Sequence, residues 1–482
     1  MTEMLKASLV YRFFAAIGQW FGGQWKESRI IQAFVNTKNE EQLAEGSRVF
    51  QLGGRLRDLQ VKVFRALRLD RLFRGSIFAM PYIWCLAAVV LAPLVPTMLL
   101  LGLVLLAGMA CIIRFGTERE IPLVHAAVNR YIVMYAVLYM IATLTSVTVS
   151  GSLYIGLLTS VFVLSAIMIE NSVRSRKQLR WVVRGLVFAA VLVALYGIYQ
   201  YFFGTGGTET WVDEDMFSDI STRVYSTLDN PNVLSEYLLL AIPMAAACLF
   251  SVKTWARRIL YFAACCIMCL CMIFTFSRGG WLGLLFAIFI FLILVDRRFI
   301  FLILAGVVCL LLFSPDVITD RFTSIGNVTD TSTSYRVSIW MGTLEMLKDY
   351  WMTGIGPGTQ AFNMIYPAYS YNTISAPHAH NLFLQIICDA GIVAIVVFVI
   401  LIIVFIRMNC HAISVEKEHT AKMMQIGSLA SIGGFLVQSM TDYSFYNYRV
   451  MFLFWAYLAL SAVFCRVNGM ERDKEDPVEL QS

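Results

Sequence analysis

The stretch QIICDAGIVAIVVFVILIIVFI, residues 385–406, decides the fold class, because Asp389 is its only charged side chain. A helix needs about 20 mainly apolar residues to cross a hydrocarbon core roughly 30 Å thick. The run is continuous rather than alternating, which excludes a strand of a membrane β-barrel. The whole chain of 482 residues is 59% hydrophobic and 15% charged, against about 25% charged in soluble domains. This composition predicts a protein embedded in a membrane.

Similar apolar runs recur along the chain and predict an all-α polytopic membrane protein with about twelve transmembrane helices. They are expected at residues 77–94, 97–113, 131–149, 153–169, 185–203, 232–252, 259–276, 281–295, 299–314, 385–406, 423–440 and 449–465.

Basic residues in the connecting segments predict the orientation. Lys and Arg gather in 114–130, 170–184, 253–258 and 296–298. With an even number of spans, these segments lie on the same side as both termini, which the positive-inside rule assigns to the cytoplasm. Residues 204–231 and a large loop between spans nine and ten then lie outside.

We therefore expect five regions. They are a basic amphipathic cytoplasmic region at 1–75, spans one to nine at 76–314, an extracytoplasmic loop at 315–384, spans ten to twelve at 385–466, and a cytoplasmic tail at 467–482. Within the first region, Leu, Val and Phe alternate with Arg over 55–74, which predicts an amphipathic helix on anionic membrane lipid.

The outer loop contains a second amphipathic pattern, SYRVSIWMGTLEMLKDYWMTGI at 334–355. Helical spacing brings five apolar side chains to one face of this predicted helix. Such a face suits a helix that lies on the membrane or caps a cavity. The residues are Val337, Trp340, Met341, Leu344 and Leu347.

Few arginines lie in the segments predicted to be outside, so the presence of these few has to be explained. They are Arg223, Arg278, Arg321 and Arg336. Arg278, followed by Gly279 and Gly280 between two spans, is interpreted as an anion clamp, or else as an interfacial arginine that reaches lipid phosphates.

For Arg336, at the start of the loop helix, bidentate phosphate binding and a solvated helix face remain open. Arg223 has acidic neighbours to pair with, and Arg321 follows Asp320 directly. The turn Asn230-Pro231-Asn232 predicts a helix N-cap.

Two histidines, His378 and His380, precede span ten in SAPHAHNLFLQ (375–385). Either could act as a general base near neutral pH, or simply cap a helix or hold a hydrogen bond. Asn381 could hold a loop carbonyl or an imidazole, and Asp389 is a carboxylate inside a span, where ionisable groups are functional or paired. No metal site is predicted, since the cysteines fall in apolar spans.

Nucleotide-binding and hydrolase motifs are absent from the sequence, which indicates no cofactor, no nucleic-acid partner and no nucleotide chemistry. A substrate that reacts outside must arrive already activated. Outward arginines and a histidine near the membrane suit a lipid-linked phosphate donor and a hydroxyl acceptor.

The stretch HAHNLFLQIICDAGI (378–392), preceded by SRGGW (277–281) and by the helix that opens at Arg336, resembles the O-antigen ligase and O-antigen polymerase superfamily of bacterial membrane glycosyltransferases. The resemblance covers roughly residues 190–440. It implies a C-type glycosyltransferase-like fold and a metal-independent transfer from an undecaprenyl-pyrophosphate-linked glycan. This would occur at the outer side of a bacterial cytoplasmic (inner) membrane, in cell-envelope polysaccharide biosynthesis.

By position, the resemblance implies catalytic roles for His380, Arg278 and Arg336. Arg223, His378, Asn381 and Asp389 are expected to bind or support the substrate. His378 is an extra histidine, so either imidazole could be the working base.

The resemblance leaves the acceptor open. A ligase would transfer the glycan to a lipid, glycan or protein acceptor, and a polymerase would transfer it to the next lipid-linked repeat unit. A lipid-glycan flippase is the alternative from another class, but a transporter is expected to show inverted repeats and ionisable residues at the membrane midplane. Here the unusual residues gather at the outer face.

Overall fold

The computed structural model describes residues 48–117, 126–204, 223–299, 301, 306 and 331–475. These residues form α-helices and short 3-10 helices, and no strand occurs among them. The all-α class is therefore confirmed for the described part of the chain. The chain divides into two compact units, residues 1–59 and 60–482.

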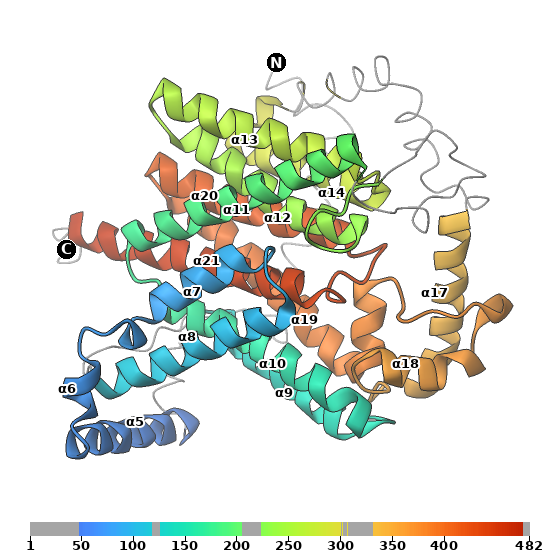
Figure 1. Ribbon diagram of the computed structural model, residues 1–482, viewed down its shortest axis with the longest axis horizontal. Coiled ribbons are helices and arrows are strands. Elements are labelled where there is room, and N and C mark those ends of the chain that lie inside the picture. The colour runs from blue at the N-terminus through green and yellow to red at the C-terminus, as the bar shows by residue number, and fades with distance from the viewer. Residues whose placement is uncertain are drawn as a thin grey trace, which may run out of the picture. The chain divides into compact units, whose positions relative to one another are not determined.

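Among the described residues, eight helices are long and apolar enough to cross a membrane. Two further apolar helices, α7 (Pro81–Leu91) and α9 (Asn129–Leu144), are shorter, and α20 (His419–Gln438) packs beside the long ones (Figure 1). The eight are α8 (Thr97–Thr117), α10 (Val149–Ser172), α11 (Arg176–Phe203), α12 (Pro231–Ser251), α13 (Trp255–Phe274), α14 (Arg278–Val295), α19 (Leu382–Val415) and α21 (Tyr448–Glu475).

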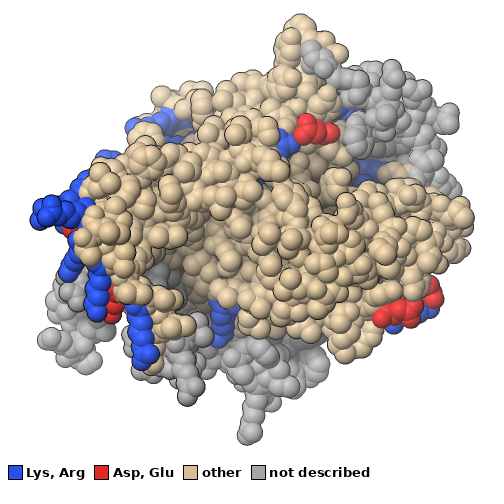
Figure 2. Space-filling model, turned by 60° about the horizontal axis from the view of Figure 1, so that its bottom comes forward, with Lys and Arg blue, Asp and Glu red and all other residues tan. Residues whose placement is uncertain are grey.

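These helices confirm a multi-pass membrane protein. Each predicted span contains a helix, except for the one at 299–314, which lies almost entirely outside the described residues. The count of twelve stays a prediction for that reason. Much of the visible surface carries no charged side chain (Figure 2), as expected where helices face lipid tails.

Small residues let the central helices approach closely, as is usual in membrane bundles. Helix α12 is among the most enclosed of these, packing against both α14 and α20. A Cβ atom added at Gly283 of α14 would lie 2.6 Å from the carbonyl oxygen of Gly434 in α20. Ser431 of α20 donates to the Leu240 carbonyl of α12 at 2.7 Å. The three helices form one tightly packed group.

The packed helices have two chemically different ends. At one end, Arg176 at the start of α11 pairs with Glu418 at 2.6 Å, beside the start of α20. At the other end, Ser235 in the first turns of α12 contacts Gln438 in the last turn of α20. Helix α12 thus runs roughly 30 Å, at 1.5 Å per residue, from the second end to the first.

The basic segment predicted as one helix over 55–74 is interrupted. Helix α5 (Arg48–Ala66) ends before α6 (Leu69–Phe73), because Arg68 between them adopts a left-handed backbone with φ 56°. The apolar side chains Leu59 and Val63 of α5 are exposed. Lipid binding by this segment stays a prediction, and residues 1–47 and 476–482 lie outside the described residues.

The predicted loop helix is present as α17 (Thr331–Tyr350), followed by the short helix α18 (Thr359–Ile365). This part of the chain has a small hydrophobic core of its own, which includes Ile339, Met346 and Phe362. The expected apolar face was partly wrong, since Met341 and Leu344 are 46% and 55% exposed. The packed face is rotated from it, because α17 rests on the turns that follow α18 and on α19.

A break in α19 fixes this loop region to the membrane helices. Gly391 has φ 76°, so the backbone hydrogen bonds of the helix are interrupted at this residue. The freed backbone groups bond to the segment after α17. Ile392 donates to the Trp351 carbonyl at 2.8 Å, and Ile355 donates to the Cys388 carbonyl at 2.7 Å. These bonds attach residues 351–356, here called the strap, to the break in α19.

Replacing Gly391 by alanine should disrupt this junction. The added Cβ would overlap the Met352 carbonyl oxygen, and the backbone would keep a φ that side chains rarely adopt. We expect the free energy of unfolding to fall by about several kcal/mol, which would be seen as a lower unfolding midpoint in detergent. Gly102→Ala on α8 is the matched control, because nothing lies within 4 Å of its added Cβ. Equal midpoints for the two variants would contradict the strap.

Candidate active site

Three of the four sequence-predicted outer arginines line one small polar cavity. Arg223 precedes α12, Arg278 is the first residue of α14, and Arg336 lies in the second turn of α17. The cavity has a volume of about 40 Å³ and is walled mainly by polar side chains. The fourth, Arg321, lies outside the described residues. Three segments spread over more than a hundred residues of sequence thus bring three cations to one place.

Asp442, in the connection between α20 and α21, is the carboxylate of this cavity. Its Oδ2 accepts from Asn232 Nδ2 at 2.9 Å and lies 3.9 Å from Arg336 Nη2. Its Oδ1 accepts from the Tyr443 backbone N–H at 2.9 Å and lies 3.4 Å from His380 Nδ1. Its two oxygens therefore contact one amide, one backbone donor, one arginine and one histidine.

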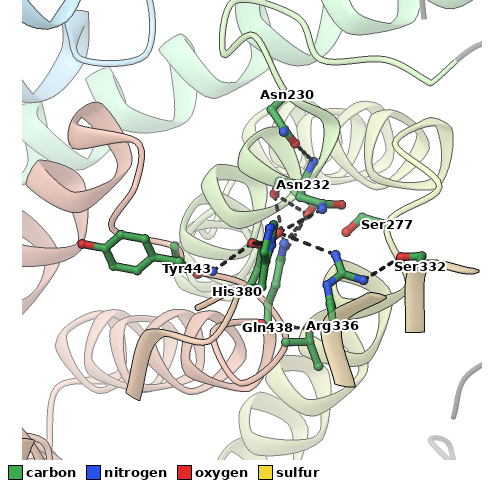
Figure 3. A network of polar contacts seen from close by, with 12 residues as sticks. Asn230, Asn232, Ser277, Ser332, Arg336, His380, Gln438 and Tyr443 are labelled. Carbon is green, nitrogen blue, oxygen red and sulfur yellow. Dashed lines mark hydrogen bonds and ion pairs between the residues drawn. The ribbon is translucent and has the colours of Figure 1, made fainter. Parts of the chain in front are cut away.

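The ends of α12 and α20 complete the polar wall (Figure 3). Asn230 caps α12, its side chain accepting from the Asn232 N–H at 2.8 Å, as the sequence predicts. Asn232 accepts from Arg223 Nη2 at 3.2 Å, and Arg223 Nε donates to the Thr275 carbonyl at 2.9 Å. Gln438 donates to the Asn232 carbonyl at 3.0 Å. Arg223 is thus held from both sides with its guanidinium at the cavity.

The described acidic residue nearest to Arg223 in the following sequence, Asp229, is engaged elsewhere. Asp229 bonds to Arg449 of α21 at 2.7 Å. The other acidic residues of the 204–231 segment lie outside the described residues.

His380 is held in a strained turn before α19. Its φ is 44°, a left-handed value that costs energy for a side-chain-bearing residue. Trp340 of α17 donates to its carbonyl at 3.3 Å, and the Tyr335 ring lies edge-on at 5.8 Å. The side chain is 20% exposed. The turn aims the imidazole at Asp442 while leaving part of it accessible.

His378 is in a different environment. It is buried, and its Nδ1 accepts from the His380 backbone N–H at 3.2 Å. Its ring packs against Tyr446 at 4.8 Å. Burial, together with the neighbouring His380 imidazole and the Arg336 charge, lowers the pKa of His378 to about 3, although Asp442 opposes the shift. His378 therefore stays neutral near pH 7 and holds the turn.

The pKa of Asp442 is set by opposing effects. Burial alone would raise it. The hydrogen bond from His380 and the charges of Arg336 and His380 outweigh burial and hold the pKa well below its usual range. Asp442 is consequently a carboxylate at neutral pH. It can accept a hydrogen bond from a protonated Nδ1 of His380 but is unsuited to act as a base itself.

Asn381 and Asp389 lie beside the cavity rather than in its wall. Asn381 caps α19, accepting from the Leu384 N–H at 3.0 Å and donating to the Met440 carbonyl at 2.7 Å. Asp389 is buried deeper, where it accepts from Gln385 at 2.8 Å and from Tyr139 at 3.2 Å. Gln385 in turn accepts from the Ala379 N–H at 2.7 Å. Both residues therefore position the histidine turn.

The described residues contain no group of three or more His, Cys, Asp or Glu side chains arranged to hold a metal ion. The cysteines of CCIMCLC (265–271) lie along α13 as free thiols. Three of the side chains that line the cavity are arginines, against the single carboxylate of Asp442, so the excess positive charge suits an anion.

The low pKa of His378 makes stability pH-dependent. Below pH 6.5 the histidine of the unfolded chain becomes protonated, whereas His378 of the folded protein stays neutral until the pH approaches 3. The stabilisation from the neutral His378 is therefore fully present above pH 6.5 and is lost as the pH falls toward 3. At pH 5 the loss amounts to about 2 kcal/mol. His378→Asn, which keeps an acceptor for the His380 N–H, should flatten the decline in unfolding midpoint between pH 7.5 and pH 5. A decline as steep as in the wild type would refute this assignment.

Comparison with known protein families found one match. Residues 263–399 match the family model described as O-antigen ligase. None of the curated proteins compared matches the chain. The matched region contains Arg278, Arg336 and both histidines, and the superfamily predicted from the sequence is thereby confirmed. The chain is therefore a multi-pass membrane protein whose residues 263–399 match the O-antigen ligase family.

Proposed function

We propose that the protein is a membrane glycosyltransferase of the ligase type. It would transfer a glycan from an undecaprenyl-pyrophosphate-linked donor to an acceptor hydroxyl at the outer face of a bacterial inner membrane. The observation that carries the proposal is the convergence of Arg223, Arg278 and Arg336 on one cavity next to the His380–Asp442 pair. Three cations and one accessible imidazole match a diphosphate leaving group and an acceptor proton.

The donor would be held by its pyrophosphate. Arginine forms bidentate bonds to phosphate oxygens, and these bonds strengthen as negative charge develops on the leaving group. Arg278 also stands at the N-terminus of α14, where Ser277 caps the helix and the helix dipole favours an anion. Apolar helices beneath the cavity would accommodate the polyprenyl chain.

His380 would act as the general base. With its Nδ1 proton directed at Asp442, the opposite ring nitrogen Nε2 carries a lone pair. The acceptor O–H would give its proton to Nε2 while its oxygen bonds to the anomeric carbon. The bond from that carbon to the pyrophosphate oxygen breaks, and its electron pair leaves with the undecaprenyl pyrophosphate. A single displacement of this kind inverts the anomeric carbon.

The outward orientation rests on charge. The segments at 170–184 and 253–258 are rich in Lys and Arg and lie at the end of the bundle opposite the cavity. The positive-inside rule would place that end, with both termini, in the cytoplasm. No step of the proposed transfer requires a metal ion or a cofactor, because arginines would offset the leaving-group charge.

Replacing His380 by alanine should lower transferase activity roughly 100-fold or more, which is the usual contribution of a general base. The assay is single-turnover transfer of lipid-linked glycan by protein in proteoliposomes. His411→Ala is the matched control, since His411 is an exposed histidine near the far end of the same helix α19. Full activity in correctly inserted His380→Ala protein would remove the assignment and make His378 the next candidate.

Arg278→Lys should also be defective, by roughly 100-fold, because lysine keeps the charge but loses the planar fork. Arg297→Lys, in the exposed turn after the other end of α14, is the control. Equal activity of the two variants would show that charge alone is sufficient at position 278.

The same chemistry would serve a repeat-unit polymerase, which is the alternative to a ligase. Mass spectrometry of lipid-linked and surface glycans from cells lacking the protein separates the two. Long polymer retained on the lipid carrier is expected for a ligase, and accumulated single repeat units would favour the polymerase. Normal surface glycan in these cells would contradict both.

A further inference from the structure

A second and larger cavity lies at the opposite end of the bundle. It has a volume of about 350 Å³ and is enclosed by the start of α11, the connection between α12 and α13, and the start of α20. Cys248 and Ser251, at the end of α12, are part of its wall, whereas Asn232 at the start of α12 belongs to the candidate active site. The two cavities are therefore separated by roughly the length of one membrane-spanning helix.

This cavity is strongly basic. Among its described lining residues the only acidic one, Glu418, is already paired with Arg176 at 2.6 Å. Arg180, Lys253 and Arg257 form no ion pair with any residue in the described ranges. The remaining basic residue of the wall is Arg184. Several cations without a protein carboxylate, at the edge of an apolar bundle, require an anion from elsewhere.

An apolar groove of about 560 Å³ continues from this cavity along the bundle. It runs between α11 and α13 and shares Arg184, Arg257 and Tyr261 with the basic cavity, so the two spaces adjoin. Its other walls are apolar, with Phe188 of α11 and Ala263 of α13 among them. Helix α13 is also among the least enclosed of the spanning helices, which leaves room for another molecule.

We propose that this joined site binds an anionic phospholipid. The headgroup phosphate lies among Arg180, Arg184 and Arg257, and an acyl chain occupies the groove between α11 and α13. Charge complementarity selects the anionic headgroup. The apolar groove at membrane depth selects a lipid rather than a free phosphate, which would use only the basic end. The site is independent of the proposed glycan transfer.

The first test measures lipid binding by the delipidated full chain in neutral detergent. Native mass spectrometry follows binding of phosphatidylglycerol, phosphatidylcholine and inorganic phosphate. Phosphatidylglycerol should bind the wild type, and Arg184→Gln combined with Arg257→Gln should weaken it by roughly 20-fold, from about 5-fold per basic side chain. Lys177→Gln with Arg298→Gln is the control, since it removes two exposed charges that line neither space. Equal weakening in both double variants would overturn the proposal.

The second test separates a lipid from a free anion. Ala263→Trp fills the groove without changing a charge, and Phe262→Trp, on the neighbouring exposed position of α13, is its control. Phosphatidylglycerol binding should fall at least about 5-fold in Ala263→Trp and stay at the wild-type level in Phe262→Trp, with both proteins melting as the wild type does. Undiminished binding in Ala263→Trp, inorganic phosphate competing fully with the lipid, or equal binding of phosphatidylcholine would each refute the proposed site.

Discussion

The candidate active site depends on one carboxylate, that of Asp442. Arg336 and His380 both approach it, and Asn232 donates to it from the start of α12. Two unit charges about 4 Å apart interact by about 4 kcal/mol at an effective dielectric constant of 20. Without this anion, the cations gathered around a cavity of about 40 Å³ would repel one another. That repulsion would push Arg336, and with it the outer loop region, away from the cavity. With it, they are held close together while their remaining donors face the cavity.

That arrangement is rigid because the histidine turn is tied to its surroundings at several points. Asn381 donates to the Met440 carbonyl, and the Leu382 N–H donates to the Ser439 and Asp442 carbonyls. On the other side, the strap at 351–356 bonds to the break at Gly391. The strained φ of His380 is sustained by these contacts, which over-determine the backbone there. A loop segment thereby gains the positional precision that acid–base chemistry requires.

The helices and most of the cationic site could be predicted from the sequence, for different reasons. Long apolar runs predict membrane helices directly. Once basic loops have been used to predict the topology, an arginine on the predicted outer side, such as Arg278, is an exception that indicates a function. Asp442 could not be predicted in this way, because an acidic residue is common in a predicted outer connection. The residues that contact Asp442 are also distant from it in the sequence. Gly391 lies inside a continuous apolar run, so its break was also invisible. The packed face of α17 depends on tertiary contacts that periodicity alone cannot identify.

The two proposed sites differ in how their cations are neutralised. Near the start of α12, polar side chains and an internal carboxylate surround a small space, which suits a compact, highly charged group that must later be released. Near its end, the space is larger, opens into an apolar groove and leaves most of its cations without a protein partner in the described chain. In the proposed transfer, the carboxylate beside the arginines would weaken their hold on the diphosphate of the donor, and weaker binding of the ground state would favour turnover. A lipid that remains bound has no such requirement, and its site can therefore leave its cations unneutralised until the lipid arrives.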